Sequence, residues 1–275
     1  MNSSSTHDKT RELSQWLLNS QHTTVFTGAG MSTESGIPDF RSPGGYWTKN
    51  KPIHFSDYMA SESQRNLAWQ RKFDPAFNLD DATPNAGHKV IADWFRKQHV
   101  QSVITQNIDN LHQKSGITNE SVIELHGNAT YAKCLSCGHV YQFPALEVSF
   151  RDTGSVPPCS QPLKRGRCEG IIKTATISFG QAMPEAEMQR AKRDTLASDL
   201  FIVLGSSLVV YPAASFPEMA KRNGAKLVIL NREATDLDGL ADLVLHEEIG
   251  DTLSQVDVLV NKSLAAVHSN PTVTE

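Results

Sequence analysis

The chain has 275 residues, 39% of them hydrophobic, and a formal net charge of −4 at pH 7 from 26 Lys and Arg against 30 Asp and Glu. The negative charge argues against nucleic acid as the main ligand, and no apolar run approaches the roughly 20 residues that span a bilayer. The polar, Ser-rich start, residues 1–10, lacks the apolar segment of a signal peptide, so we expect a cytoplasmic protein without direct membrane or nucleic-acid binding.

The first half of the chain alternates between helical and strand patterns. Apolar spacing predicts a short amphipathic helix at 11–19, and β-branched runs predict strands at 23–27, 100–105 and 121–125. Residues 48–82 mix aromatic, polar, Pro and Gly positions, which predicts a partly helical excursion over the site. A helix from Pro84 to about Gln98 follows, with an inner face of Val90, Ile91, Trp94 and Phe95.

The composition changes between residues 130 and 172. All four cysteines lie there with several prolines and glycines, and the long apolar periodicity is lost, which indicates a small inserted module. The alternation resumes with an extended segment at 171–179, helices at 184–197, 212–223 and 250–266, and strands at 200–204, 226–230 and 243–246. The whole pattern predicts an α/β fold with a parallel sheet, helices on both faces, and loose tails at 1–9 and 267–275.

The first predicted strand ends in Gly28-Ala29-Gly30, a Gly-x-Gly turn typical of a dinucleotide site. Glycine lets the backbone approach a pyrophosphate closely, and exposed N–H groups then face the anion. The third glycine of Gly-x-Gly-x-x-Gly is missing, because Glu34 stands near the expected position and the next glycine is Gly36. The loop that follows carries Asp39 and Arg41, so we expect a nucleotide site with chemistry in its loop.

The four cysteines have a spacing that favours a structural zinc site. Cys134-x-x-Cys137 places two soft thiolates at one edge of a zinc tetrahedron, and Cys159 and Cys168 complete it. Eight residues separate the second pair, more than is usual, so a mixed site that includes His139, disulfides and free thiols remain alternatives. Four sulfur ligands leave no open position, so this metal would support folding rather than catalysis.

Polar clusters follow the carboxyl ends of four predicted strands, the edge at which open α/β sheets bind ligands. Each cluster alone is explained by turn formation, but their coincidence indicates a nucleotide site. His126 ends a further strand, and histidine is the natural proton acceptor near neutral pH. The clusters are Gly28-Ala29-Gly30, Gln106-Asn107-Ile108-Asp109, Gly205-Ser206-Ser207 and Asn231-Arg232-Glu233.

Taken in order, these motifs resemble those of the sirtuins, the NAD-dependent protein lysine deacylases, from about residue 12 to 260. The resemblance implies a Rossmann-type catalytic domain at 10–129 and 173–262 and a small zinc-ribbon-like domain at 130–172. NAD and an acyl-lysine protein or peptide would meet between the two. The motifs are the clusters above with Met31-Ser32, Gly36-Ile37-Pro38-Asp39-Phe40-Arg41, His126-Gly127, Cys134-x-x-Cys137 and Phe179-Gly180.

The resemblance also implies the role of each site residue. The pyrophosphate would lie against Gly28, Ala29, Gly30 and Ser32. The cofactor loop would contain Asp39, Phe40 and Arg41, with Phe40 shielding the nicotinamide. The nicotinamide and ribose pocket would be lined by Gln106, Asn107, Ile108 and Asp109. The adenosine half would be held by Gly205, Ser206, Ser207, Asn231, Arg232 and Glu233. The implied catalytic residues are His126, the general base, with Asn107 and Asp109.

In the implied reaction, the acyl oxygen attacks C1′ of the nicotinamide ribose as nicotinamide leaves. His126 then takes the proton of a ribose hydroxyl, which attacks the resulting imidate. The products are free lysine, nicotinamide and O-acyl-ADP-ribose, so the enzyme combines the work of a transferase and a hydrolase.

Two departures from the family pattern bear on the substrate. Gln181 follows Phe179-Gly180 where the family usually has Glu, which affects the peptide preference more than the activity. Family members that prefer succinyl or malonyl groups carry a Tyr-x-x-Arg pair, and the corresponding stretch here is Trp69-Gln70-Arg71-Lys72. We therefore expect the substrate to carry a neutral acyl group, acetyl first. An anionic acyl group remains an alternative because Lys72 could pair with its carboxylate.

Two other functions fit the same fold. One is an NAD-dependent protein ADP-ribosyltransferase, which would share the cleavage of nicotinamide, and the other is a non-catalytic NAD-sensing module. The presence of His126, Asn107 and Asp109 together argues against the second. The sequence does not determine the target proteins or the oligomeric state.

Overall fold

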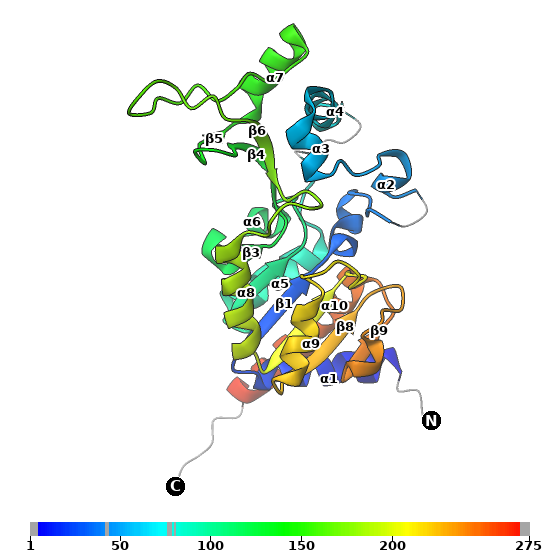
Figure 1. Ribbon diagram of the computed structural model, residues 1–275. Coiled ribbons are helices and arrows are strands. Elements are labelled where there is room, and N and C mark those ends of the chain that lie inside the picture. The colour runs from blue at the N-terminus through cyan, green and yellow to red at the C-terminus, as the bar shows by residue number, and fades with distance from the viewer. Residues whose placement is uncertain (1–4, 42–43, 76–78, 80, 270–275) are drawn as a thin grey trace.

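The computed structural model describes residues 5–41, 44–75, 79 and 81–269. A six-stranded parallel sheet occupies the larger part of the molecule, in the order β3-β2-β1-β7-β8-β9 (Figure 1). The order reverses beside β1, as in doubly wound dinucleotide-binding folds. The predicted α/β class is confirmed. The strands are β1 (Thr23–Thr27), β2 (Ser102–Thr105), β3 (Val122–Glu124), β7 (Leu200–Leu204), β8 (Lys226–Leu230) and β9 (Leu243–Leu245).

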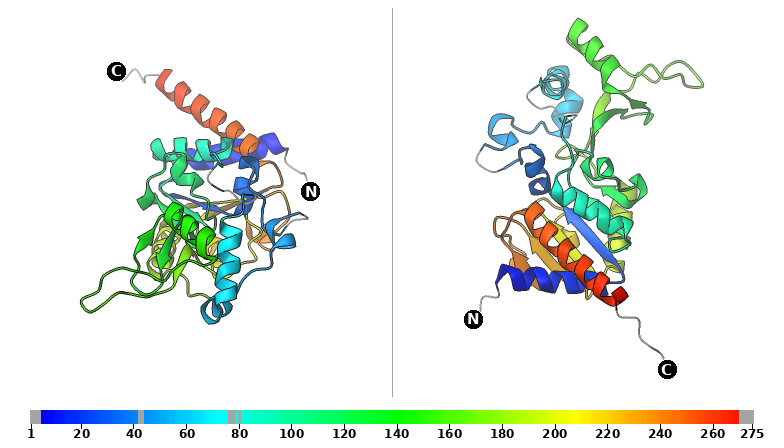
Figure 2. Two further views of the ribbon diagram at one scale, coloured as in Figure 1. Left: turned by 90° about the horizontal axis from the view of Figure 1, so that it is seen from above. Right: turned by 180° about the vertical axis from the view of Figure 1, so that it is seen from behind.

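Helices cover both faces of this sheet (Figure 2). Val25 belongs to the core beneath α1 (Thr6–Asn19), α5 (Ala86–Arg96) and α10 (Ile249–Ser269). Its neighbour Phe26 belongs to the core beneath α8 (Glu185–Ala197) and α9 (Ser215–Arg222). Successive strand residues point to opposite faces, so two buried faces explain why these strands are apolar without alternation.

A smaller part contains the cysteines. Its sheet is antiparallel, in the order β5-β4-β6, from β4 (Gly127–Cys134), β5 (Val140–Tyr141) and β6 (Ile172–Thr176). Its core joins Phe143 and Leu146 of α7 (Phe143–Thr153) to Trp69 of α4 (Glu62–Lys72). Within the predicted excursion at 48–82, Trp69 and Phe73 therefore pack against the cysteine module, and α3 and α4 lie beside that module (Figure 1), while residues 76–78 and 80 lie outside the described part of the chain.

Short elements lie between the longer helices and strands. They are η1 (Ala29–Ser35), α2 (Tyr46–Lys49), α3 (Phe55–Ala60), α6 (Leu111–Lys114), η3 (Asn119–Ser121) and η4 (Asp238–Leu240). Within the described residues, no helix is both long enough and apolar enough to cross a bilayer.

Several element boundaries differ from those expected. The first helix begins at Thr6, because Ser5 and Asp8 form a reciprocal capping box, so residues 5–9 are not a loose tail. α10 continues to Ser269, whereas residues 1–4 and 270–275 of the predicted tails lie outside the described residues. α5 begins at Ala86 rather than Pro84, since the Asn85 side chain accepts the N–H of His88 at 3.1 Å.

The cysteine module also exceeds its predicted limits of 130–172. β4 begins at Gly127 and β6 runs to Thr176, and these two strands pair along the module toward the larger sheet. Inside the module, α7 was not expected, because only Phe143 and Leu146 of its residues are buried. A helix with so small an apolar face has a weak sequence pattern.

Candidate active site

A cavity of about 660 Å³ lies at the carboxyl ends of β1, β2, β7 and β8. This volume is typical of a cofactor site. Gly28, Ser32 and Asp109 do not line it; the last two line a small adjoining pocket behind Asn107. The predicted site residues that line the cavity are Ala29, Gly30, Asp39, Phe40, Arg41, Gln106, Asn107, Ile108, His126, Gly205, Ser206, Ser207, Asn231, Arg232 and Glu233.

Two glycine turns interlock at the floor of this cavity. The Gly28 N–H donates to the carbonyl of Leu204, and the Gly30 N–H donates to that of Gly205 at 2.8 Å. A Cβ on Gly30 would lie 2.8 Å from Gly205 Cα, and one on Gly205 would lie 2.3 Å from the nitrogen of Met31. Gly205 also has a φ of +62°, which favours glycine. Only glycines allow the two turns to approach this closely, and the resulting bare backbone suits a pyrophosphate.

Glu34, which stands near the position of the missing third glycine, accepts a hydrogen bond from the backbone of α10. Its Oε1 accepts the N–H of Gly250 at 2.9 Å, in the first turn of α10. A carboxylate at a helix N-terminus is stabilised by unpaired N–H groups and by the helix dipole. The 3-10 helix η1 therefore docks on α10 at the position where a typical dinucleotide fold begins a long α-helix.

A network of buried polar groups supports the floor of the cavity. The Asn107 amide donates to the carbonyl of Gly28 at 3.0 Å and to Ser32 Oγ at 3.1 Å. Ser32 donates to Asp109 Oδ2 at 2.7 Å, and Asp109 Oδ1 accepts the N–H of Leu111 at 2.9 Å. Asn107 uses both amide hydrogens within the chain, so its Oδ1 is the atom that can accept from a ligand.

The His126 ring is held in one orientation by a carbonyl group. Its Nδ1 lies 3.0 Å from the Gln106 carbonyl oxygen. Because a carbonyl only accepts, Nδ1 carries a hydrogen and Nε2 is the basic atom. The Gln106 side chain accepts from Ser206 Oγ at 2.7 Å, which joins this histidine to the second glycine turn. Burial is the main cause that lowers the pKa of His126, the hydrogen bond to Gln106 raises it, and the charge of Arg41 lowers it further.

Three aromatic side chains, Phe40, Trp47 and Phe179, join the loop after the first glycine turn to the segment that follows β6. The Trp47 ring lies 5.2 Å from that of Phe40 and 5.3 Å from that of Phe179, and the Arg41 guanidinium lies 4.5 Å above it. The N–H of Phe55 donates to the Phe179 carbonyl at 2.9 Å. These contacts give the cavity an aromatic wall, since Phe40, Trp47 and Phe179 all line it.

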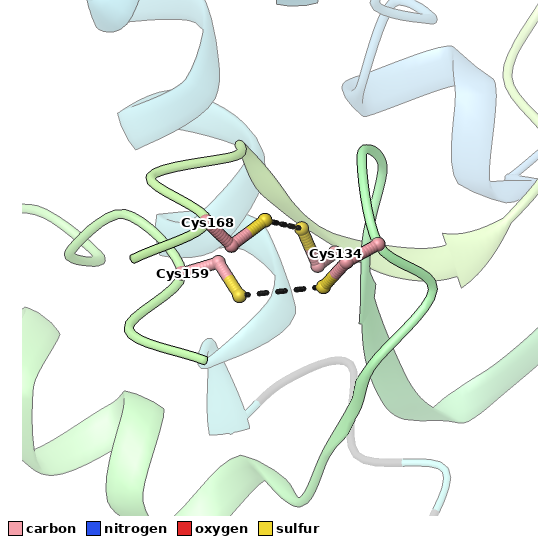
Figure 3. A group of neighbouring side chains, drawn as sticks. Cys134, Cys159 and Cys168 are labelled. Carbon is pink, nitrogen blue, oxygen red and sulfur yellow. Dashed lines mark hydrogen bonds between the residues drawn. The ribbon is translucent and has the colours of Figure 1, made fainter. Parts of the chain in front are cut away.

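The four cysteine sulfurs converge (Figure 3). All lie within 4.8 Å of one another, and the Cys134–Cys168 and Cys137–Cys159 sulfurs are 3.6 Å apart. A zinc tetrahedron with Zn–S bonds of about 2.3 Å has edges of about 3.8 Å. A disulfide needs about 2.05 Å, so the cysteines are free thiols arranged for a metal. His139 is not a member of this group, since its ring packs on Tyr141 at 4.8 Å.

The stretch expected to select acidic acyl groups does not reach the cavity. Trp69 is buried in the core of the cysteine module, Arg71 donates to the Lys51 carbonyl at 2.8 Å, and the Lys72 amine lies 4.3 Å from the Phe143 ring centre. None of the three lines the cavity formed by the described residues. Gln181 does, and its Oε1 accepts the N–H of Ser178 at 3.1 Å.

Sequence reasoning missed part of the cavity wall. Trp47 lies directly before the irregular excursion at 48–82, Pro52 and Ile53 lie in it, and none of the three had a motif of its own. Residues 208–212 follow directly after Gly205-Ser206-Ser207, so an extension of that cluster would have found them. Glu247 and Glu248 lie directly before α10 and Ile249 begins it, and these three residues had no sequence signal.

Comparison with known proteins places this geometry in a family. The model of the Sir2 family matches residues 28–212, more than half of the chain, and the chain belongs to that family. It is 55% identical over 228 residues to the NAD-dependent protein deacetylase 1 of Bradyrhizobium diazoefficiens, covering 83% of this chain and 87% of the relative. It is 40% identical over 257 residues to the NAD-dependent protein deacetylase 1 of Geobacillus kaustophilus, covering 93% and 98%.

Solved structures agree with this assignment. A Sir2 complex with a p53 peptide and NAD+ superposes with a TM-score of 0.79 at 33% identity, over 93% of this chain and 99% of that one. Sir2Tm bound to a propionylated peptide gives a TM-score of 0.77 at 33% identity, over 90% and 97%. The resemblance to the sirtuins is confirmed.

Proposed function

We propose that this protein is an NAD-dependent protein lysine deacetylase in which His126 is the general base. The observation that carries the proposal is the His126 imidazole, oriented through Nδ1 by the Gln106 carbonyl at 3.0 Å, in the same cavity as Gly30 and Gly205. The names of the relatives favour deacetylation over ADP-ribosyl transfer. The presence of His126, Asn107 and Asp109 in one connected site argues against a non-catalytic NAD sensor.

The residues present fit NAD. The interlocked turns of Gly28, Gly30 and Gly205 leave bare backbone for the pyrophosphate, with Ala29 and Ser32 beside them. The residues that would hold the adenosine half line the same cavity, and they are Ser206, Ser207, Asn231, Arg232 and Glu233. When bound, NAD supplies an electrophilic ribose carbon and ribose hydroxyls that receive the acyl group.

Each catalytic side chain then has a defined task. His126 Nε2 accepts the proton of a ribose hydroxyl, while its Nδ1–H remains on the Gln106 carbonyl and keeps the ring in place. Asn107 offers its Oδ1 to a carboxamide N–H, since its own hydrogens hold Gly28 and Ser32. Asp109 orients Ser32 and, through it, Asn107. Phe40 and Trp47 exclude water from the side of the cavity that Phe179 closes.

The substrate is an acyl-lysine protein or peptide with a neutral acyl group, acetyl first. The cations among the lining residues are Arg41, which lies over Trp47, and Arg232, which pairs with Glu248 at 2.9 Å. Lys72, whose charge kept an anionic acyl substrate as an alternative, packs on Phe143 in the module. No cation of the 69–72 stretch is therefore available inside the cavity of the described residues to receive a second carboxylate.

Zinc would have a structural role. The sulfurs of Cys134, Cys137, Cys159 and Cys168 match the edges of a zinc tetrahedron and fill all four positions. Cys134 and Cys159 belong to the core that includes Trp69 and Phe143, so the metal would stabilise the module. We also propose that the protein acts in the cytoplasm and binds no nucleic acid, which cell fractionation and a binding assay with duplex DNA would check.

A panel of acyl-lysine peptides tests the function. The purified protein is incubated with NAD and acetyl, propionyl or succinyl peptide, and nicotinamide release and product masses are measured together. We expect loss of the acetyl group from the peptide and formation of O-acetyl-ADP-ribose, with little turnover of the succinyl peptide. A target that gains ADP-ribose would instead identify a transferase, and no nicotinamide release with any peptide would restore the NAD-sensing alternative.

A further inference from the structure

Two histidines outside the cavity are buried beneath the first glycine turn. His112 of α6 is 1% exposed and His88 of α5 is 0% exposed, and their ring centres lie 5.0 Å apart. Burial lowers the pKa of His112 to about 4. Burial and the neighbouring His112 lower the pKa of His88 to about 3, against the opposite influence of Asp109. Both rings are therefore neutral at neutral pH.

A chain of hydrogen bonds runs from His112 to the nicotinamide side of the cavity. His112 Nε2 lies 2.9 Å from Thr27 Oγ1, and Thr27 donates to Thr105 Oγ1 at 2.8 Å. Thr105 Oγ1 accepts the backbone N–H of Asn107 at 3.0 Å. Thr27 and Thr105 are the last residues of β1 and β2, so the chain spans the ends of both strands.

The direction of this chain determines the state of the His112 ring. The hydroxyl of Thr27 has one hydrogen and gives it to Thr105, so its oxygen accepts from His112. Nε2 must carry the hydrogen, and Nδ1 has no partner among the described residues. Both nitrogens of His88 also lack partners there, so the buried His88 ring acts as a neutral packing surface for His112.

We propose that His112 is a positioning residue of the deacetylase, acting as a neutral Nε2–H donor that holds Thr27, Thr105 and Asn107 in register. Asn107 in turn holds Gly28 and Ser32 at the floor of the cavity. The effect on catalysis rests on the proposed function, whereas the state of the ring does not. Without the donor, the Thr27 hydroxyl can turn away from Thr105. Thr105 Oγ1 is then less firmly held as the acceptor of the Asn107 backbone N–H.

Matched variants test the proposal. His112→Leu removes the donor and keeps an apolar side chain, and we expect kcat/KM for NAD to fall about fivefold to tenfold, as for the loss of one buried hydrogen bond. The KM for the acetyl peptide should remain unchanged. His112→Gln offers an amide N–H in place of Nε2–H and should restore most of the activity. His99→Gln, a partly buried histidine after α5 and outside the network, is the control and should behave as wild type.

Nitrogen-15 NMR of the wild-type imidazole groups gives a test that needs no activity. We expect one histidine that stays in the Nε2–H form from pH 8 to pH 5 and disappears in His112→Leu. An Nδ1–H form of the His112 ring, or its protonation in this range, would overturn the proposal, and His112→Gln assigns the same signal where His112→Leu does not fold. It would also be overturned if His112→Gln were as impaired as His112→Leu while equally stable, or if His112→Leu lowered the melting temperature without changing NAD kinetics. A wild type without deacetylase activity would contradict the proposed function. The positioning role of His112 would then be decided by the NMR result and by the effect of the variants on NAD affinity.

Discussion

Ile177 donates its backbone N–H to the carbonyl of His126 at 2.8 Å. The next residue, Gly127, pairs with Thr176 at the start of β4 and approaches Ala175 so closely that a Cβ would lie 2.0 Å from its carbonyl oxygen. The backbone of His126 is thus fixed by the strand that leaves the cysteine module. The segment that leaves the cysteine module therefore fixes the position of the proposed general base.

This link predicts an effect of zinc removal on activity. We expect one zinc per chain, and we expect chelation to lower both the melting temperature and the deacetylation rate, because β6 loses its anchor near Cys168 while no metal chemistry is involved. Elemental analysis, calorimetry and the peptide assay measure the three quantities, and added zinc should restore them. A metal-free protein with unchanged stability and rate would refute the link.

Replacement of the base separates binding from chemistry. His126→Ala should fold, bind NAD and lose deacetylation by about 10²–10⁴-fold, the contribution of a positioned base. Calorimetric NAD binding and the peptide assay measure the two effects. His22→Ala, before β1 at the opposite end of the strands, is the control and should keep full activity. Full activity in His126→Ala would show that the mechanism is wrong.

The pH dependence should follow the His126 ring. Activity requires neutral Nε2, and burial and Arg41 lower the pKa of His126 below its ordinary value near 6.5. As the pH falls, kcat/KM for NAD should therefore decline with a midpoint below pH 6.5. Arg41→Gln removes a nearby positive charge and should move this midpoint upward. A wild-type midpoint above pH 6.5, or a downward shift in the variant, would contradict the assignment.

The interlocked turns predict a position-specific effect of an added methyl group. Gly205→Ala adds a Cβ 2.3 Å from the Met31 nitrogen, so both turns must move, and we expect NAD affinity to be lost together with stability. Gly154→Ala is a matched control, because Gly154 also has a positive φ, +77°, but has nothing within 4 Å of a Cβ. It should lose only about 1 kcal/mol of stability and keep its NAD affinity. Equal NAD affinity in the two variants would refute the prediction.

The buried histidine pair predicts acid sensitivity. Below pH 6.5 the unfolded chain binds protons that the native His88 and His112 exclude until about pH 3 and 4. The free energy of unfolding should therefore fall with the pH in this range, by up to about 1.4 kcal/mol per pH unit for each histidine. His88→Phe should reduce this slope, measured by urea unfolding, and comparison at pH 8 gives the effect of packing alone. An unchanged slope would contradict the burial of a neutral His88.

Much of the fold follows from local patterns that act over a few residues. The strands at 23–27, 200–204 and 226–230 have the expected limits, because continuous β-branched and apolar runs are typical of strands buried on both faces. The helix starts were less accurate, since caps such as Ser5 and Asn85 involve single hydrogen bonds that apolar spacing does not reveal.

From the residues themselves, the candidate site was predictable mainly where a motif ends a strand, and Asp39, Phe40 and Arg41 were added by the family resemblance. Gly30, Asn107 and Gly205 follow their strands directly, so strand order alone brings them together. Trp47 enters the cavity wall through contacts with Phe40 in the same loop region and with Phe179, which is remote in sequence, and no periodicity encodes these contacts. The state of His112 depends in the same way on Thr27 and Thr105, which meet only after β1 and β2 have paired.

The pairing of β1 with β7 has a consequence for synthesis of the protein. Thr27 pairs with Thr105 on one side and with Leu204 on the other, so the first strand leaves the ribosome long before β7, its second partner, exists. Until residue 205 has emerged, the first glycine turn has no second turn to meet, and a truncated chain has no complete nucleotide pocket.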